Sequence, residues 1–118
     1  MATSLAKKLN LKPGMKLNIP SIPELVELDD VSLGSPSETE NVLVFITKLA
    51  EIDHKCESVI QAARQDNLAW IAYPKAKKLG TDLNRDILWQ HMEQYDIQGV
   101  RMISIDDTWS AMRFRVKK

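Results

Sequence analysis

The chain has 118 residues, no net charge at neutral pH, 44% hydrophobic residues and 27% charged residues. This length and composition are typical of one soluble domain, residues 1–118. No apolar run approaches the roughly 18 residues of a membrane span, and zero net charge argues against a polyanionic partner. One cysteine excludes a disulfide within the chain, which fits a reducing compartment, so we expect a cytoplasmic protein with no membrane contact.

The first forty residues predict short elements separated by turns. We expect a short helix over residues 5–9, ended by a Lys-Pro-Gly sequence, and a strand over 15–19, where apolar and polar residues alternate. A proline at the first position favours a helical turn over 23–28, and residues 31–33 suit a short edge strand. Glycine, serine and proline then predict a loop over 34–40.

Two near-continuous apolar runs, 42–46 and 68–73, predict buried strands. Between them, residues 49–65 carry apolar side chains at helical spacing and predict one amphipathic helix. A strand–helix–strand order with strands of this kind favours two parallel strands in a sheet that is covered on both faces.

The second half of the chain predicts one more helix and a hairpin. Thr81 or Asp82 is expected to cap a helix over 83–95. Two alternating runs, 100–105 and 109–116, are joined by a short polar turn and predict an antiparallel hairpin. Together the elements predict an α/β fold with three αβα layers, in which a mostly parallel, Rossmann-like sheet ends in an antiparallel C-terminal hairpin.

Several motifs occur in order along the chain, and they are Leu5-Ala6-Lys7-Lys8-Leu9, Lys12-Pro13-Gly14, Trp70-Ile71-Ala72-Tyr73-Pro74-Lys75, Thr81-Asp82-Leu83 and Ile105-Asp106-Asp107-Thr108-Trp109-Ser110. This set resembles a family of short bacterial proteins that is known only as a domain of unknown function. The resemblance covers nearly the whole chain. It implies a stand-alone cytoplasmic bacterial protein and carries no activity or catalytic residue with it.

The expected architecture also resembles a shortened methyltransferase-type Rossmann fold, in which the last strand inserts antiparallel into the sheet. Such enzymes bind S-adenosylmethionine over a glycine-rich turn after the first strand. Residues 18–23 take that place here and contain no glycine, so side chains would keep the backbone away from the ligand. We therefore expect the fold without methyl transfer and without a cofactor. The missing motif weighs against enzymatic activity but leaves it open.

A basic loop is the first candidate ligand site. Lys75, Lys77 and Lys78 follow the carboxyl end of a predicted strand, where ligands bind in open α/β sheets. Thr81 and Asp82 begin the next helix, whose free N–H groups attract anions. These five residues suit a phosphate or a carboxylate. The alternative is an ordinary solvated loop, and the carboxylate of Asp82 would itself occupy the helix N-terminus.

A second candidate is an interaction surface. Trp89 lies beside the apolar stripe of its helix and favours a protein contact. Trp109, Arg113 and Arg115 share one face of the last strand, which we expect to be partly wet. Basic and aromatic side chains on a sheet also bind single-stranded nucleic acid. Because the chain is 6% aromatic and carries no net charge, nucleic acid is the less favoured partner.

The remaining chemistry-bearing residues predict structural roles. We expect His54 on an exposed helix face, His91 as a hydrogen-bonded histidine in the core or at its rim, and Cys56 as a small buried hydrophobe. One cysteine and two separated histidines make no closed zinc site, so no metal is expected. Asp106 and Asp107 suit turn geometry better than metal binding or acid–base chemistry.

These observations favour a non-enzymatic binding or interaction module, whose partner is another protein or a second copy of the chain. The alternative is a binder of, or an enzyme acting on, a small anionic metabolite or nucleotide at the carboxyl ends of the strands. Under that alternative, the lysines of the basic loop supply the electrostatic contacts.

Overall fold

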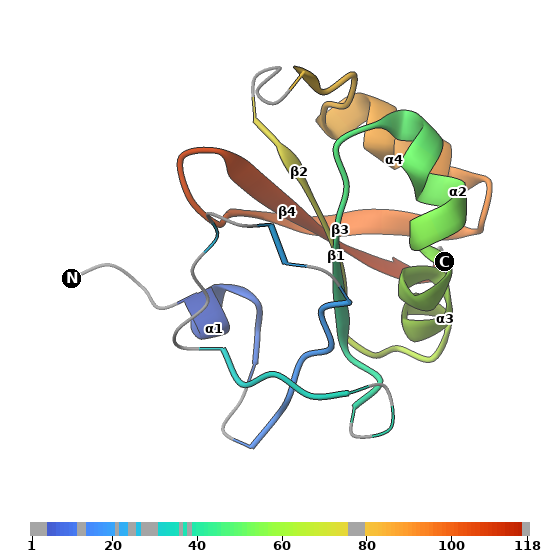
Figure 1. Cartoon of the computed structure of the whole chain (residues 1–118). Helices are drawn as coiled ribbons and strands as arrows, with labels where there is room; N and C mark the ends of the chain where they lie inside the picture. The colour runs from blue at the N-terminus through green and yellow to red at the C-terminus, as the bar shows by residue number, and fades with distance from the viewer. Residues whose placement is uncertain are drawn as a thin grey trace.

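A four-stranded sheet with the order β1-β2-β4-β3 forms the centre of the molecule (Figure 1). The computed structural model describes residues 5–11, 14–20, 22–23, 26, 31–35, 37, 39–75 and 80–116. β1 (Val42–Phe45) and β2 (Ala69–Pro74) run parallel. β4 (Trp109–Val116) lies antiparallel between β2 and β3 (Ile97–Ser104). The predicted parallel pair and the predicted hairpin are therefore both confirmed.

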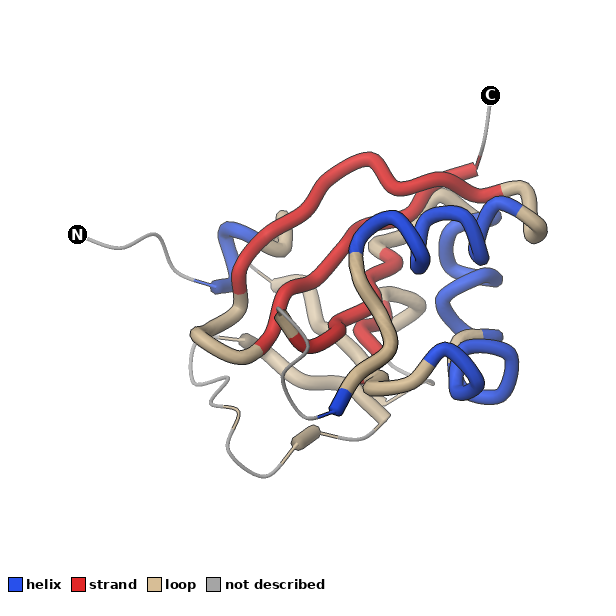
Figure 2. The backbone as a smooth tube through the Cα atoms, turned by 90° about the horizontal axis from the view of Figure 1, so that it is seen from above, coloured by secondary structure: helices blue, strands red, loops and turns tan. Residues whose placement is uncertain are grey.

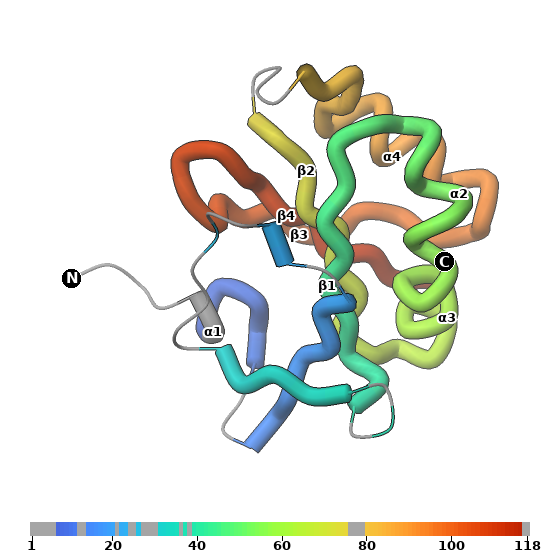
Figure 3. The backbone as a smooth tube through the Cα atoms, in the orientation of Figure 1, coloured from blue at the N-terminus to red at the C-terminus, as the bar shows by residue number. Residues whose placement is uncertain are grey.

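The helices that connect the strands lie on one face of the sheet (Figures 1 and 2). A 3-10 helix, η1 (Leu49–Glu51), is followed by α2 (Ile52–Lys55) and α3 (Glu57–Arg64) between β1 and β2. α4 (Arg85–Glu93) links β2 to β3. The first short helix, α1 (Leu5–Lys8), belongs to the N-terminal segment on the opposite side of the sheet (Figure 3).

The predicted three-layer αβα fold is wrong. The sheet holds one parallel pair and two antiparallel pairs, so it is mixed and not a mostly parallel Rossmann-like sheet. As far as the described residues show, its second face is covered by the largely irregular N-terminal segment and not by a layer of helices. The molecule is a small α+β protein.

Each face of the sheet has its own apolar core, because successive strand residues point to opposite sides. On the helix side, Ile71, Leu88 and Phe114 are fully buried. On the N-terminal side, Leu9, Leu17 and Trp70 are fully buried. The burial of one large apolar side chain contributes about 1.5–3 kcal/mol, so both cores stabilise the fold.

A buried hydrogen bond links the N-terminal segment to β2. The indole Nε1 of Trp70 donates to the carbonyl oxygen of Leu9 at 3.2 Å. Since both residues are fully buried, this bond satisfies a donor that would otherwise be costly to bury. Met15 and Leu11 pack against the same core.

Two local predictions need correction. The single helix expected over 49–65 is divided into η1, α2 and α3, and Cys56 lies between α2 and α3 with φ −102° and ψ 11°. The apolar stripe survives the break because Cys56 N still donates to Ile52 O and Ile60 N to Cys56 O.

The strands expected over 15–19 and 31–33 appear only as isolated bridges, Leu17 with Leu33 and Asn18 with Val42. Most of the helical turn expected over 23–28 lies outside the described residues.

Candidate functional site

A cavity of about 360 Å³ lies at the carboxyl end of β2, on the helix side of the sheet. We call it the strand-end cavity. The sheet side contributes Tyr73, Lys75, Met102 and Ser110, and the start of α4 contributes Asn84, Arg85 and Asp86. The cavity lies where the sequence predicts a ligand site. Lys75 was predicted to contact the ligand, whereas the other residues named above were not.

Backbone and side-chain contacts hold Lys75 in this cavity. Its N–H donates to Thr108 O at 2.8 Å, and its Nζ donates to Ser104 Oγ. The ammonium group therefore has a neutral hydroxyl partner among the described residues and no carboxylate. The positive charge of Lys75 remains available to an anion.

Tyr73 supplies a hydroxyl group at the same place. The hydroxyl donates to the thioether of Met102 at 3.0 Å, which is a weak acceptor. Burial raises the pKa of Tyr73. At neutral pH this phenol is protonated and serves as a hydrogen-bond donor.

The first turn of α4 forms the other wall. Asn84 caps the helix, and its Oδ1 accepts from Ile87 N at 2.8 Å. The Nε of Arg85 lies 3.5 Å from an oxygen of Asp86, and both side chains are well exposed. Lys75 and Arg85 against Asp86 give this cavity a net charge of +1, and the positive end of the α4 dipole adds to it.

The expected roles of Thr81 and Asp82 are wrong in part. Neither caps α4, since Asn84 does so. Thr81 donates to Thr47 O and accepts from Leu83 N, and Asp82 accepts from Leu49 N at 2.8 Å. Both side chains therefore fasten the chain ahead of α4 to η1. Lys77 and Lys78 lie outside the described residues.

A partly buried carboxylate, that of Glu51, lies close to Asp82 at the start of η1. Glu51 accepts from the backbone N–H groups of Thr47 and Lys48, each at 2.8 Å, and from the hydroxyl of Thr47 at 2.7 Å. It also pairs with Lys55. Although burial alone raises the pKa of Glu51, these hydrogen bonds lower it to about 2. Glu51 is thus a structural carboxylate.

The expected interaction surface is not continuous in the structure. Trp89 is 38% exposed on α4. Trp109 is only 4% exposed, and its ring meets that of Phe45 edge to face at 5.0 Å. The N-terminal segment covers the strand face that was expected to be wet, so Trp109 offers almost no surface to a partner. Arg113 and Arg115 are half-buried on that same face.

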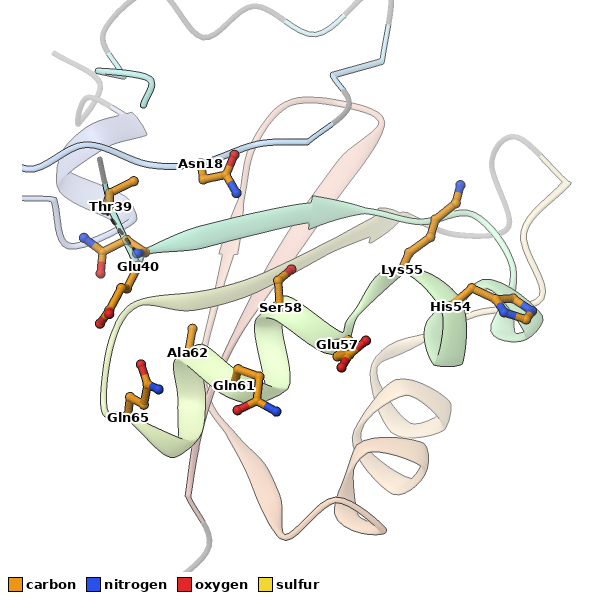
Figure 4. Close-up of a pocket in the computed structure, with 11 residues that line it drawn as sticks. Asn18, Thr39, Glu40, His54, Lys55, Glu57, Ser58, Gln61, Ala62 and Gln65 are labelled. Carbon is orange, nitrogen blue, oxygen red and sulfur yellow. Dashed lines mark hydrogen bonds between the residues drawn. The ribbon is translucent and has the colours of Figure 1, made fainter. Parts of the chain in front are cut away.

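A groove of about 550 Å³ runs between α3 and the chain ahead of β1 (Figure 4). His54 and Lys55 lie at one end of it and Gln65 at the other. Its lining mixes amides, hydroxyls and charges of both signs. The ammonium of Lys55 is already paired with Glu51. These side chains do not converge on one point (Figure 4), so the groove is a weaker candidate than the strand-end cavity.

The histidines and the cysteine lie where the sequence predicts. His54 is exposed, Cys56 is fully buried, and burial raises the pKa of its thiol to about 12. His91 lies at the rim, with Nε2 3.0 Å from Asp53, which also accepts from Tyr95. Across the described ranges no three His, Cys, Asp or Glu side chains gather as a metal site would require.

Comparison of the chain with models of protein families, with curated proteins and with solved structures gives no match. The resemblance to a family of short bacterial proteins therefore stays a prediction that rests on the sequence motifs. In the part of the chain that the structure describes, no helix is both long and apolar enough to cross a bilayer.

The sequence reasoning missed Tyr73, Asn84 and Arg85 as cavity residues. Each left a signal in the sequence. Tyr73 lies at the end of an apolar run, directly before Pro74 and Lys75. Asn84 is of a residue type that favours the N-cap, and its side chain accepts from the backbone N–H of Ile87, three residues later. Arg85 directly follows this N-cap, so it lies in the first turn of α4 and at the same end of the helix as Asn84.

Proposed function

We propose that the protein is a non-enzymatic binding module that holds a small anionic metabolite or nucleotide in the strand-end cavity. One observation carries this proposal. Lys75 and Arg85 come from different elements and line one cavity of about 360 Å³. That volume lies in the range of small-ligand sites, roughly 300–1,000 Å³.

The chemistry of the lining favours an anion. An ammonium group acts as a point charge toward phosphate, and a guanidinium offers a planar set of donors to phosphate or carboxylate. The hydroxyls of Tyr73 and Ser110 and the amide of Asn84 add neutral hydrogen-bonding groups. Such a combination fixes the orientation of a phosphate-bearing or carboxylate-bearing molecule.

Two observations support binding rather than catalysis. The high pKa of Tyr73 makes this residue a donor and a poor base. The thiol of Cys56 is buried in the helix-side core and its pKa is about 12. A thiolate nucleophile therefore does not form at neutral pH.

Titration calorimetry with AMP and with inorganic phosphate tests the proposal. We expect saturable binding of at least one of the two, and loss of about tenfold or more in affinity in Lys75→Met and in Arg85→Met, as for other charged hydrogen bonds. Arg64→Met, which removes an exposed arginine on α3, is the matched control and should bind like wild type. Absence of binding by either probe, or equal affinity in all three variants, would contradict the proposal.

A second candidate function is self-association along β3, which forms one edge of the sheet. Three apolar side chains on or beside this strand are well exposed: Trp89 at 38%, Val100 at 47% and Met102 at 47%. An edge strand pairs with its own copy through a two-fold axis, which makes the contact self-complementary.

Analytical ultracentrifugation distinguishes this second candidate. A concentration-dependent dimer in wild type that is lost in Trp89→Ala and in Met102→Lys would support it. A monomer at every concentration, or a dimer that both variants retain, would exclude β3 as the contact.

A further inference from the structure

A second cavity, of about 210 Å³, lies on the opposite face of the sheet and at the opposite end of β2. We call it the Arg113 cavity. Arg113 of β4 lines it together with Asn10 and Met15 of the N-terminal segment and Asp66, Asn67 and Leu68 ahead of β2. It shares no residue with the strand-end cavity, so a ligand here is independent of the proposed function.

One hydrogen-bond donor of the Arg113 guanidinium is unsatisfied among the described residues. Its Nε is shielded from water and has no hydrogen-bond partner among the residues that the structure describes. A buried donor of this kind costs about 1–3 kcal/mol when nothing accepts from it. A buried polar group without a partner needs an explanation, and a bound ion or small molecule is one of them.

The neighbouring charges make the region electropositive. Arg101 faces Arg113 directly across the β3–β4 pairing, and Arg115 lies two residues further on the same face of β4. Burial and then these two arginines lower the pKa of Arg113, and Asp66 opposes them. Around the cavity, these three arginines outnumber the two carboxylates of Asp66 and Glu40, which leaves a net charge of +1.

The nearest carboxylate is already engaged elsewhere. Asp66 Oδ1 accepts from Arg115 at 3.0 Å (Nε) and 2.8 Å (Nη2). Asn67 donates to Glu40 at 2.8 Å. The carboxylate of Asp66 is therefore paired with Arg115, and the amide of Asn67 is bonded to Glu40. Among the described residues, no carboxylate forms an ion pair with Arg113.

We propose that the Arg113 cavity binds a small aliphatic carboxylate. The guanidinium presents parallel N–H donors that match the two oxygens of a carboxylate. Met15 and Leu68 give the cavity apolar walls for a short hydrocarbon chain. The small volume and the mixed lining fit a carboxylate with a few carbon atoms better than a nucleotide.

The test uses butyrate as the probe and two-dimensional ¹H–¹⁵N NMR of the full chain as the readout. We expect saturable shifts of the backbone amides of Asn10 and Leu68 and of the side-chain Nε–H of Arg113. Affinity should fall by about tenfold or more in Arg113→Met, in line with the loss of a charge-assisted hydrogen bond. Arg64→Met, which removes an exposed arginine that lines neither cavity, should leave butyrate binding unchanged.

A second variant, at an exposed position, tests the cavity in case Arg113→Met disturbs the fold. Asn10 is exposed and has a left-handed backbone with φ 65°, which aspartate tolerates nearly as well. Asn10→Asp places a negative charge on the cavity wall and should weaken butyrate without touching the core. The proposal is overturned if butyrate gives no saturable shifts, if both variants bind it as wild type does, or if inorganic phosphate saturates the site while butyrate does not.

Discussion

A substitution at Glu51 tests how much the hydrogen bonds of one carboxylate stabilise this fold. The substitution Glu51→Gln removes the charge from a carboxylate that accepts two backbone N–H groups and one hydroxyl at 2.7–2.8 Å. It also removes the ion pair with Lys55. The glutamine keeps one carbonyl oxygen, so the change mainly removes charge.

The magnitude follows from the pKa. Burial works against ionisation, but the hydrogen bonds outweigh it and lower the pKa of Glu51 from 4.5 to about 2. At about 1.4 kcal/mol for each pH unit, that interval corresponds to about 3.4 kcal/mol. The side chain is 24% exposed, so water screens part of this energy, and we expect about 1.5 kcal/mol.

The sign determines how the effect depends on pH. A carboxylate whose pKa is depressed in the folded protein stabilises the fold above the unfolded pKa, and this stability is lost as the pH falls through the folded pKa. Glu51→Gln should therefore lower the free energy of unfolding by about 1.5 kcal/mol near pH 7. The difference from wild type should shrink steadily between about pH 4.5 and pH 2.

Urea denaturation followed by tryptophan fluorescence measures both quantities, since Trp70 and Trp109 are buried. Glu57→Gln, at an exposed position in the first turn of α3, is the matched control and should change stability little. The reasoning is refuted if the gap between Glu51→Gln and wild type is the same near pH 7 and near pH 3, or if the control loses as much.

Three further predictions concern packing and capping. Gly99→Ala should destabilise the protein by about 1–3 kcal/mol in the same urea assay, because the new methyl group would lie 2.5 Å from the sulfur of buried Met112; unchanged stability would mean that Met112 moves freely. Asp82→Ala should cost about 1 kcal/mol by removing the acceptor for Leu49 N, whereas Asp82→Asn should retain most of the stability. Cys56 should react with a thiol reagent such as DTNB only in denaturant, since its pKa is about 12, and a fast reaction of the native protein would contradict its burial.

Local patterns in the sequence predicted the local structure well. The spacing of apolar residues identified the parallel pair β1 and β2, the helical connection between them and the β3–β4 hairpin. Each of these depends on residues near one another in the chain, where periodicity carries the signal. The turn role of Asp106 is also local, and the structure shows its carboxylate accepting from the N–H groups of Thr108 and Trp109.

The fold class failed because it depends on long-range pairing. The apolar runs of β1 and β2 correctly indicated that both faces are covered, but such runs do not identify what covers them. Here Leu9 and Leu17 of an irregular segment do so. The hairpin pattern also leaves open which of its strands joins β2, and the choice of β4 makes the sheet mixed.

The same difference between local patterns and long-range contacts applies to the candidate site. Lys75 was found because it follows a strand that periodicity identifies. Arg85 was missed because its place depends on where α4 begins, and Thr81 and Asp82 were assigned to that position instead. Their side chains bind Thr47 and Leu49, more than thirty residues earlier in the chain. No local pattern records that contact.

The cover over the second face of the sheet has a consequence for the order of folding. Leu9 and Trp70 are 61 residues apart in the sequence, and Lys8 bonds to Ser104 across 96. Loop closure becomes less favourable as the closed loop lengthens, so we expect residues 5–11 to dock after the nearby hairpin strands have paired. In the native state we expect the same residues to open as a separate unit, whose amide hydrogens should exchange with solvent before those of the central strands. When this unit opens, every strand pairing of the sheet remains, and the indole of Trp70 meets water.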